Sequence, residues 1–290
     1  IPPLSIITIK FFFLDVEAKT GKLNPAKNNE VAVHIFRGRY RTIPKNLGRV
    51  MRVVADNIYE NIEKITLVLE SQAGELARFT IRRDQFEKAT VGLGSAQEIW
   101  QTASIEPPHS GWSKDGEIYN NTLYPDIRWG VRPGLMQHIG GGDQFFLHEL
   151  FANVSFKISF ADGFDIDSAF AIDLFNNFDR ITIPSFSSLP KVRSDIKNYL
   201  QSGQTTIRKL RVNYMFSPFR DIYTRLTVGY FEMMFGGFGG EVLYRPFGKR
   251  YAYGLDINYA RQRDFDQLWG FRDYSIKTGH FNFYYNSPFY

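Results

Sequence analysis

The segment from Tyr251 to Ala260 reads Tyr-Ala-Tyr-Gly-Leu-Asp-Ile-Asn-Tyr-Ala, and its alternation decides the fold class. Successive side chains of a β-strand point to opposite faces of the sheet, so every second residue belongs to one face. One face of this segment carries tyrosine, leucine and isoleucine, whereas the other carries alanine, glycine, aspartate and asparagine. The same alternation recurs between Thr206 and Tyr244. These segments are therefore predicted to be amphipathic strands of an antiparallel sheet.

On the apolar face, aromatic residues lie toward the strand ends and aliphatic residues fill the middles. The aromatic positions are Tyr214, Phe216, Tyr230, Tyr244, Tyr251, Tyr253 and Tyr259. An aliphatic band between two aromatic girdles is typical of the outer wall of a transmembrane β-barrel, whose strands need about 9 to 11 residues to cross. A soluble β-sandwich also alternates, but its apolar face packs on a second sheet. We predict a mainly β protein with an antiparallel transmembrane β-barrel, or part of one, whose girdle faces the membrane.

The composition agrees with a barrel and excludes several other classes. Aromatic residues make up 16% of the chain, which is a high share for a soluble domain. No segment approaches the roughly 20 consecutive apolar residues of a membrane-spanning helix, so a helical membrane protein is excluded. The formal net charge is +5, but basic and acidic residues are interspersed, and we expect no nucleic-acid partner. Cysteine is absent, which excludes disulfides and cysteine-ligated metals.

The first part of the chain has the periodicities of a soluble core. Residues 1–105 are predicted to form a small α+β domain, and residues 106–124 form a polar linker with proline and glycine. The elements expected in the domain are strands at 5–14 and 30–36, a helix at 44–61, a hairpin at 65–70 and 77–82, and a short helix capped by Asp84.

Residues 125–290 are predicted to form about eight antiparallel barrel strands, and the barrel is expected to be incomplete. The expected spans are 126–138, 145–161, 164–175, 204–216, 222–232, 234–245, 251–262 and 274–285. Short turns at 162–163, 217–221 and 246–250 alternate with other connections, of which 176–203 is the longest. Bacterial barrels keep short turns in the periplasm, so we expect residues 1–105 to lie in the periplasm. The connection near Met233 is shorter than this rule requires.

Two segments between the strands have their own interpretations. Residues 189–200 have the spacing of a short amphipathic helix that plugs or caps the barrel. The glycine-rich residues 234–241 are interpreted as a bend in a strand, because glycine weakens strand packing.

The polar face of the strands is predicted to line a lumen, and no catalytic site stands out on it. The candidate glycan contacts are Arg211, Arg225, Glu241, Asp256 and Asn258, whose groups hydrogen-bond sugar hydroxyls. The alternative is that they are hydrated charges that set barrel packing. Carboxylates suited to acid–base catalysis exist at Asp165, Asp167, Asp173, Glu232 and Glu241. His138, His148 and His280 lie on three different predicted strands, so we expect no metal, no cofactor and no enzymatic activity.

Several long motifs resemble the YjbH/GfcD family of outer-membrane proteins. They are Leu189-Pro-Lys-Val-Arg-Ser-Asp-Ile, Gly229-Tyr-Phe-Glu-Met-Met-Phe-Gly-Gly-Phe-Gly-Gly-Glu-Val-Leu-Tyr-Arg-Pro, Asp256-Ile-Asn-Tyr-Ala-Arg-Gln-Arg-Asp-Phe and Thr278-Gly-His. The resemblance covers residues 125–285 clearly and the first 105 residues loosely. It implies a larger protein with two barrel regions joined by periplasmic segments. It also implies a link to operons for secreted polysaccharide, including exopolysaccharide and group 4 capsule, and a periplasmic partner protein.

The sequence and the resemblance together predict a non-catalytic outer-membrane barrel that assists export or surface assembly of a secreted polysaccharide. Its expected partners are outer-membrane lipids, the polysaccharide and a periplasmic protein of the same pathway. Two alternatives remain open at this point. One is a general porin for small solutes, and the other is a barrel enzyme that acts on glycan or lipid.

Overall fold

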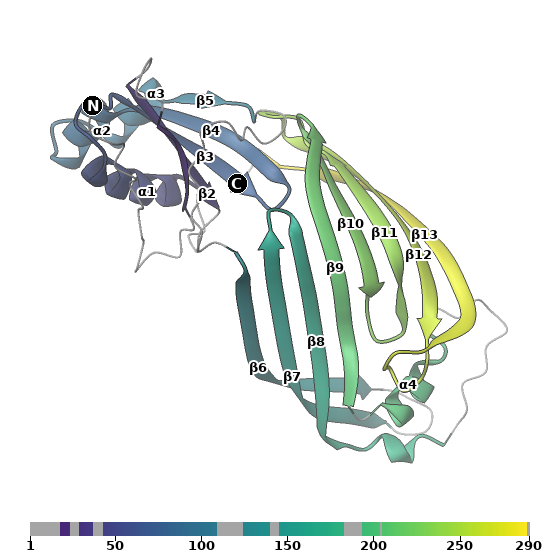
Figure 1. Cartoon of the computed structure of the whole chain (residues 1–290). Coiled ribbons are helices and arrows are strands. Elements are labelled where there is room, and N and C mark those ends of the chain that lie inside the picture. Colours follow the sequence, from purple (N-terminus) through teal and green to yellow (C-terminus); the bar gives the residue numbers. More distant parts are fainter. Residues whose placement is uncertain are drawn as a thin grey trace.

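The computed structural model describes residues 18–23, 29–36, 43–108, 124–139, 145–182, 193–203 and 205–288. Two sheets account for the strands of these residues, one with five strands and one with eight. Figure 1 shows the five-stranded sheet and its helices at one end of the larger, strongly curved sheet. The strand predicted at 5–14 and most of the predicted linker lie outside the described residues.

The smaller sheet has the strand order β1-β2-β3-β4-β5. Its strands are β1 (Ala18–Leu23), β2 (Glu30–Phe36), β3 (Lys64–Ser71), β4 (Gly74–Arg82) and β5 (Ser104–Glu106). Helix α1 (Ile43–Asn57) connects β2 to β3, which pair in parallel, while the other neighbours are antiparallel. Apolar residues of α1 three or four positions apart, including Leu47, Val50 and Val54, are buried against the alternating apolar residues of β2 and β3.

Two short helices follow β4, and their start signals differ from the prediction. Helix α2 (Arg83–Thr90) begins after Arg82, so Asp84 lies within its first turn and does not cap it. Asp84 instead accepts a hydrogen bond from Nε of Arg82 at 3.1 Å. Helix α3 (Ala96–Thr102), which we did not predict, begins with a capping box between Ser95 and Glu98.

The larger sheet contains eight antiparallel strands in sequence order. They are β6 (Asp126–Ile139), β7 (Phe146–Ala161), β8 (Phe164–Asn176), β9 (Thr205–Phe219), β10 (Ile222–Tyr230), β11 (Phe235–Tyr244), β12 (Tyr251–Arg263) and β13 (Phe271–Tyr285). The predicted ends agree with these bounds to within three residues. The prediction of a mainly β, antiparallel protein is therefore confirmed. Within the described residues, β6 and β13 are the two edges of the sheet and do not pair with each other.

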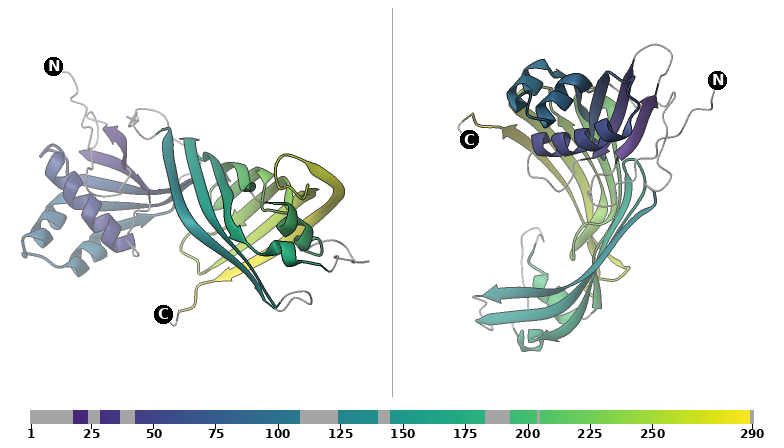
Figure 2. Two further views of the ribbon diagram at one scale, coloured as in Figure 1. Left: turned by 90° about the horizontal axis from the view of Figure 1, so that it is seen from below. Right: turned by 90° about the vertical axis from the view of Figure 1, so that its left-hand side faces the viewer.

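The curvature gives the larger sheet two different faces. Figure 2 shows the strands curving around helix α4 (Ile196–Ser202), and we call the face toward α4 the inner face. The inner face carries polar side chains such as Lys157 and Asp167, while the outer face carries apolar ones. On the outer face, Val228 is 52% exposed and Ile257 is 59% exposed. The outer face is therefore not the buried face of a β-sandwich.

The smaller domain contacts the larger sheet at its short turns. The hydroxyl group of Tyr223 donates a hydrogen bond to the carbonyl oxygen of Glu75 at 3.2 Å. A Cβ atom on Gly163 would lie 3.1 Å from the carbonyl oxygen of Gln72, so the β3–β4 turn reaches the β7–β8 turn. Phe247, in the β11–β12 turn, packs against the core of the smaller domain. The domain is thus held at the short-turn end of the sheet.

The opposite end of the sheet is covered by a compact cap. Helix α4 and the short 3₁₀ helix η1 (Phe178–Arg180) lie there, as Figure 1 shows for α4. Part of the predicted helix at 189–200 lies outside the described residues. Four residues lie between β10 and β11, so this connection does not follow the predicted alternation of short and long connections. Within it, Glu232 accepts a hydrogen bond from Arg193 at its carboxylate and one from Arg263 at its carbonyl oxygen.

The glycine-rich segment is part of a regular strand. Strand β11 pairs with β10 and β12 without a register shift, and the bend in this segment stays a prediction. A Cβ atom on Gly239 would lie 1.9 Å from Oδ1 of Asn258, so the glycine gives the Asn258 side chain its place beside β11. Among the helices of the described residues, none combines the length and the apolar character that crossing a membrane requires.

Candidate functional site

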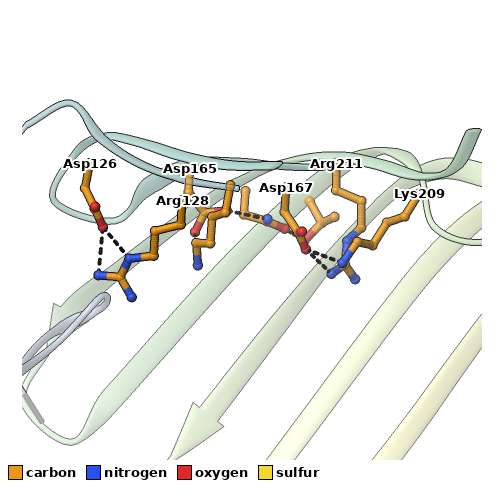
Figure 3. A network of polar contacts seen from close by, with 9 residues as sticks. Asp126, Arg128, Asp165, Asp167, Lys209 and Arg211 are labelled. Carbon is orange, nitrogen blue, oxygen red and sulfur yellow. Dashed lines mark hydrogen bonds and ion pairs between the residues drawn. The ribbon is translucent and has the colours of Figure 1, made fainter. Parts of the chain in front are cut away.

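The inner face of β6 to β9 carries three neighbouring groups of ion pairs, which together we call the ladder. Its members are Asp126, Arg128, Lys157, Asp165, Asp167, Lys209 and Arg211, and Figure 3 shows six of them labelled. Asp167 holds two cations through its Oδ2 atom, with Lys209 Nζ at 2.8 Å and Arg211 Nη2 at 2.7 Å. Arg211, a predicted glycan contact, is therefore engaged in the ladder.

Asp165, in the middle of the ladder, is buried. Asp165 accepts a hydrogen bond from Asn213 at 2.8 Å and lies 3.3 Å from the Lys157 ammonium group. Asn213 in turn accepts a hydrogen bond from Thr227 at 3.0 Å. Buried charges are tolerated when they are paired and hydrogen-bonded, and this arrangement meets both conditions. The ladder is thus a structural element that joins neighbouring strands.

The inner face of β10 to β13 carries a second set of polar residues, which we call the row. Its members are Arg225, Glu241, Asp256, Asn258 and His280, and four of the five are predicted glycan contacts. Register pairs Arg225 with Glu241, Glu241 with Asp256, and Asp256 with His280, so these four members lie side by side on the four strands, and Asn258 is a second member on β12. The structure therefore brings these four predicted contacts together and separates them from Arg211.

Contacts within the row centre on two carboxylates. Nη2 of Arg225 lies 2.5 Å from Oε2 of Glu241. Oδ1 of Asp256 accepts a hydrogen bond from Nδ2 of Asn258 at 2.9 Å and lies 3.0 Å from Nδ1 of His280. His280 is 65% exposed at its side chain, in contrast to the buried Asp165 of the ladder. The row is an open, preorganised set of donors and acceptors.

The cap contains a buried arginine that the sequence did not reveal. Arg263 is fully buried and donates hydrogen bonds to four carbonyl oxygens, those of Ile207, Glu232, Gln267 and Leu268. Tyr199 of α4 donates a hydrogen bond to the carbonyl oxygen of Arg263. Burial raises the pKa of Tyr199 to about 12. Arginine and tyrosine at these positions have no spacing that separates them from surface residues, so only the folded chain shows their role.

Most of the predicted girdle residues lie on the outer face, with one exception. Tyr214, Tyr244, Tyr251 and Tyr253 are exposed, and Phe216 and Tyr259 are half-buried. Tyr230 is buried, so its place in the predicted girdle is wrong. Its ring packs under the Arg263 guanidinium at 4.1 Å, and its hydroxyl group donates to the carbonyl oxygen of Trp269 at 2.8 Å. Gly229, directly before Tyr230, has a positive φ of 131°, so the backbone leaves the ordinary strand conformation just before the buried tyrosine.

The other groups considered for chemistry are separate from one another. His148 stacks on Phe146, with ring centroids 5.2 Å apart, whereas His138 lies on β6 and His280 on β13. Asp165 and Asp167 belong to the ladder, and Glu232 accepts a hydrogen bond from Arg193 at 2.6 Å. Across the described ranges, no three histidine or carboxylate side chains gather in a way that would hold a metal ion.

Comparison with known proteins gives the chain its family. The model of the YjbH family, described as exopolysaccharide biosynthesis protein YbjH, matches residues 18–290. The chain belongs to this family. The predicted resemblance is confirmed, and the chain is related to exopolysaccharide biosynthesis at the level of its family.

A curated relative extends this comparison. The chain is 34% identical over 279 residues to the protein named "Uncharacterized lipoprotein YjbH" of Escherichia coli (strain K12). The match covers 91% of this chain but only 38% of that protein, so the chain spans less than half of its relative's length. No solved structure matches the chain.

Proposed function

We propose that this chain forms part of an outer-membrane β-barrel that assists export or surface assembly of a secreted polysaccharide without cleaving it. The observation that carries the proposal is the contrast between the two faces of the curved sheet. A polar inner face and an exposed apolar outer face are the arrangement of a barrel wall between water and lipid. Membership of an exopolysaccharide biosynthesis family supplies the pathway.

The apolar outer face favours lipid over water as its environment. Large side chains are exposed on strands across the sheet, among them Trp129, Val228, Ile257 and Phe281. Monomeric soluble proteins rarely expose contiguous apolar patches of more than a few hundred Å². The lipoprotein name of the relative supports membrane association. The domain at the short-turn end would lie in the periplasm, where we propose that it meets a partner protein of the same pathway.

A non-catalytic role agrees with the state of the carboxylates. Asp167 holds two cations, and Glu241 holds Arg225 at 2.5 Å. A general acid or nucleophile needs a carboxyl group that is free to exchange protons or attack a substrate. Asp167 is therefore a structural group, and the more exposed pair of Arg225 and Glu241 is better suited to hydrogen-bonding hydroxyl groups that pass along the inner face.

Disrupting the intact gene in its host tests the proposal. We expect polysaccharide to accumulate in the periplasm and to fall at the cell surface, and the wild-type gene should restore the surface level. An unchanged distribution would overturn the export role. Liposomes that contain the protein and swell equally with all small solutes would then favour the general porin.

Neighbouring residues on opposite faces test the membrane orientation. The chain has no cysteine, so Ile257→Cys and Asn258→Cys each introduce a single labelling site. In lipid vesicles, a polarity-sensitive fluorophore should report a hydrocarbon environment at position 257 and a hydrated one at position 258. Equal hydration at both positions would contradict a lipid-facing outer wall.

A further inference from the structure

An aromatic residue, Tyr284, lies next to the row on the side of the short turns, and it is not among the contacts predicted from the sequence. Tyr284 shares the inner face of β13 with His280, because the two residues are four positions apart on one strand. It is 51% exposed, and its Cε2 atom lies 3.4 Å from the position that a Cβ atom on Gly254 would take. Since Gly254 has no side chain, Tyr284 reaches across the neighbouring strand β12.

Asn282 connects Tyr284 to the row. The Gly254 position lies 3.5 Å from Cβ of Asn282, and Nδ2 of Asn282 lies 3.5 Å from Oδ2 of Asp256. An exposed tyrosine therefore lies beside the Gly254 position next to Asn282, and the amide of Asn282 contacts the Asp256 carboxylate, which also contacts Asn258 and His280. Aromatic rings pack on the C–H face of sugar rings, while amides, carboxylates and imidazoles hydrogen-bond the hydroxyl groups.

From this juxtaposition we infer that Tyr284, Asn282 and the row form a binding site for the uncharged sugar units of a polysaccharide. The inference rests on the proposed function, because it assigns a ligand class to the inner face that the polysaccharide would meet. The row alone crosses three strand spacings, which is about 14 Å at about 4.8 Å for each spacing. The site is thus an elongated surface along which a glycan chain can lie.

The charges of the site select against acidic sugars. Arg225 is the one arginine or lysine of the row, and Glu241 neutralises it at 2.5 Å. Asp256 adds a second carboxylate to the row, and its partner Asn258 carries no charge. A uronate would approach these carboxylates without a free cation to receive it, and like charges repel. Neutral hydroxyl groups meet no such cost and can use the donors and acceptors that Asp256 orients.

Binding of defined oligosaccharides to the purified protein in detergent micelles tests the site. We would compare a hexasaccharide of glucose with a hexasaccharide of galacturonic acid by isothermal titration calorimetry. The neutral probe should bind, and the acidic probe should bind at least about tenfold more weakly. Equal or tighter binding of the acidic probe would overturn the inference, as would the absence of binding to the neutral probe by folded protein.

Variants locate the binding to this site. Tyr284→Leu and His280→Ala should each weaken binding of the neutral probe by about tenfold, whereas Tyr284→Phe keeps the ring and should bind as wild type. His138→Ala removes an exposed histidine from the same face of β6 and serves as the matched control. Circular dichroism checks that each variant folds. Wild-type affinity in folded Tyr284→Leu and His280→Ala would place the binding elsewhere.

The outcome is separable from that of the export proposal. If gene disruption abolishes surface polysaccharide but the Tyr284→Leu gene restores it fully, export stands and this site is wrong. If disruption changes nothing while the purified protein binds the neutral probe through Tyr284, the site stands and the export role is wrong.

Discussion

The ladder and the row lie on the same inner face and are built from the same residue types, yet their surroundings differ. Asp167 in the ladder and Asp256 in the row have side chains that are 21% and 23% exposed, so their burial is nearly equal. Asp167 holds two cations, whereas Asp256 holds an asparagine and an exposed histidine. The two carboxylates therefore differ in their partners and not in their burial. The charged partners of Asp167 make it a structural group, whereas the partners of Asp256 leave it available to a ligand.

The largest expected difference in the free energy of unfolding comes from the same Asp→Asn substitution made in the ladder and in the row. Asp167→Asn leaves Lys209 and Arg211 without their counter-charge on a half-buried surface, and should lower the free energy of unfolding by about 2–3 kcal/mol. Asp256→Asn keeps a hydrogen-bonding group beside Asn258 and the exposed His280, and should cost less than about 1 kcal/mol. Chemical unfolding of the two variants in lipid vesicles measures both values. Similar losses would erase the distinction between ladder and row.

A second, smaller effect on the free energy of unfolding is expected from the cap, whose contribution to stability depends on pH. Burial raises the pKa of Tyr199 to about 12, above its usual value of 10.0. Between pH 10 and pH 12, the unfolded chain releases a proton that the folded chain keeps, so the stability contributed below pH 10 falls by up to about 2 kcal/mol as the pH rises. Unfolding measured from pH 8 to pH 12 should show this loss in wild type.

Tyr199→Phe isolates the effect of that one hydroxyl group. The variant should lose part of its stability at neutral pH with the hydrogen bond to Arg263, but should have a flatter decline above pH 10. Tyr284→Phe is the matched control, since it removes the hydroxyl group of an exposed tyrosine beside the row and should keep the wild-type profile. An unchanged slope in Tyr199→Phe would show that the cap does not govern alkaline unfolding.

The sequence predicts the bounds of the strands in the larger sheet well, but it predicts poorly which side chains contact one another across strands. Alternation in a stretch such as 251–260 fixes which residues share a face, because the period of a strand is two. It also groups Asp256 with Asn258, but it cannot show that His280 faces Asp256, since that depends on the register between two strands. Tyr230 follows the alternation and is still buried, because it packs against Arg263 at the end of β12 and Trp269 in the following loop, both more than 30 residues away in the sequence. Long-range packing of this kind leaves no local pattern to detect.

The smallest expected difference between row and ladder is in how strongly salt changes the stability that their ion pairs contribute. Arg225 and Glu241 of the row are 48% and 35% exposed at their side chains, so their attraction is screened by ions. Arg225→Gln should lower the free energy of unfolding by about 0.5 kcal/mol at low ionic strength and by almost nothing at about 1 M salt. Lys209→Gln, which removes a more enclosed cation 2.8 Å from Asp167, should keep most of its cost of about 1 kcal/mol at both salt concentrations. Equal salt sensitivity of the two variants would mean that the ladder is as open to solvent as the row, and Asp167 would then be as available to a ligand as Asp256.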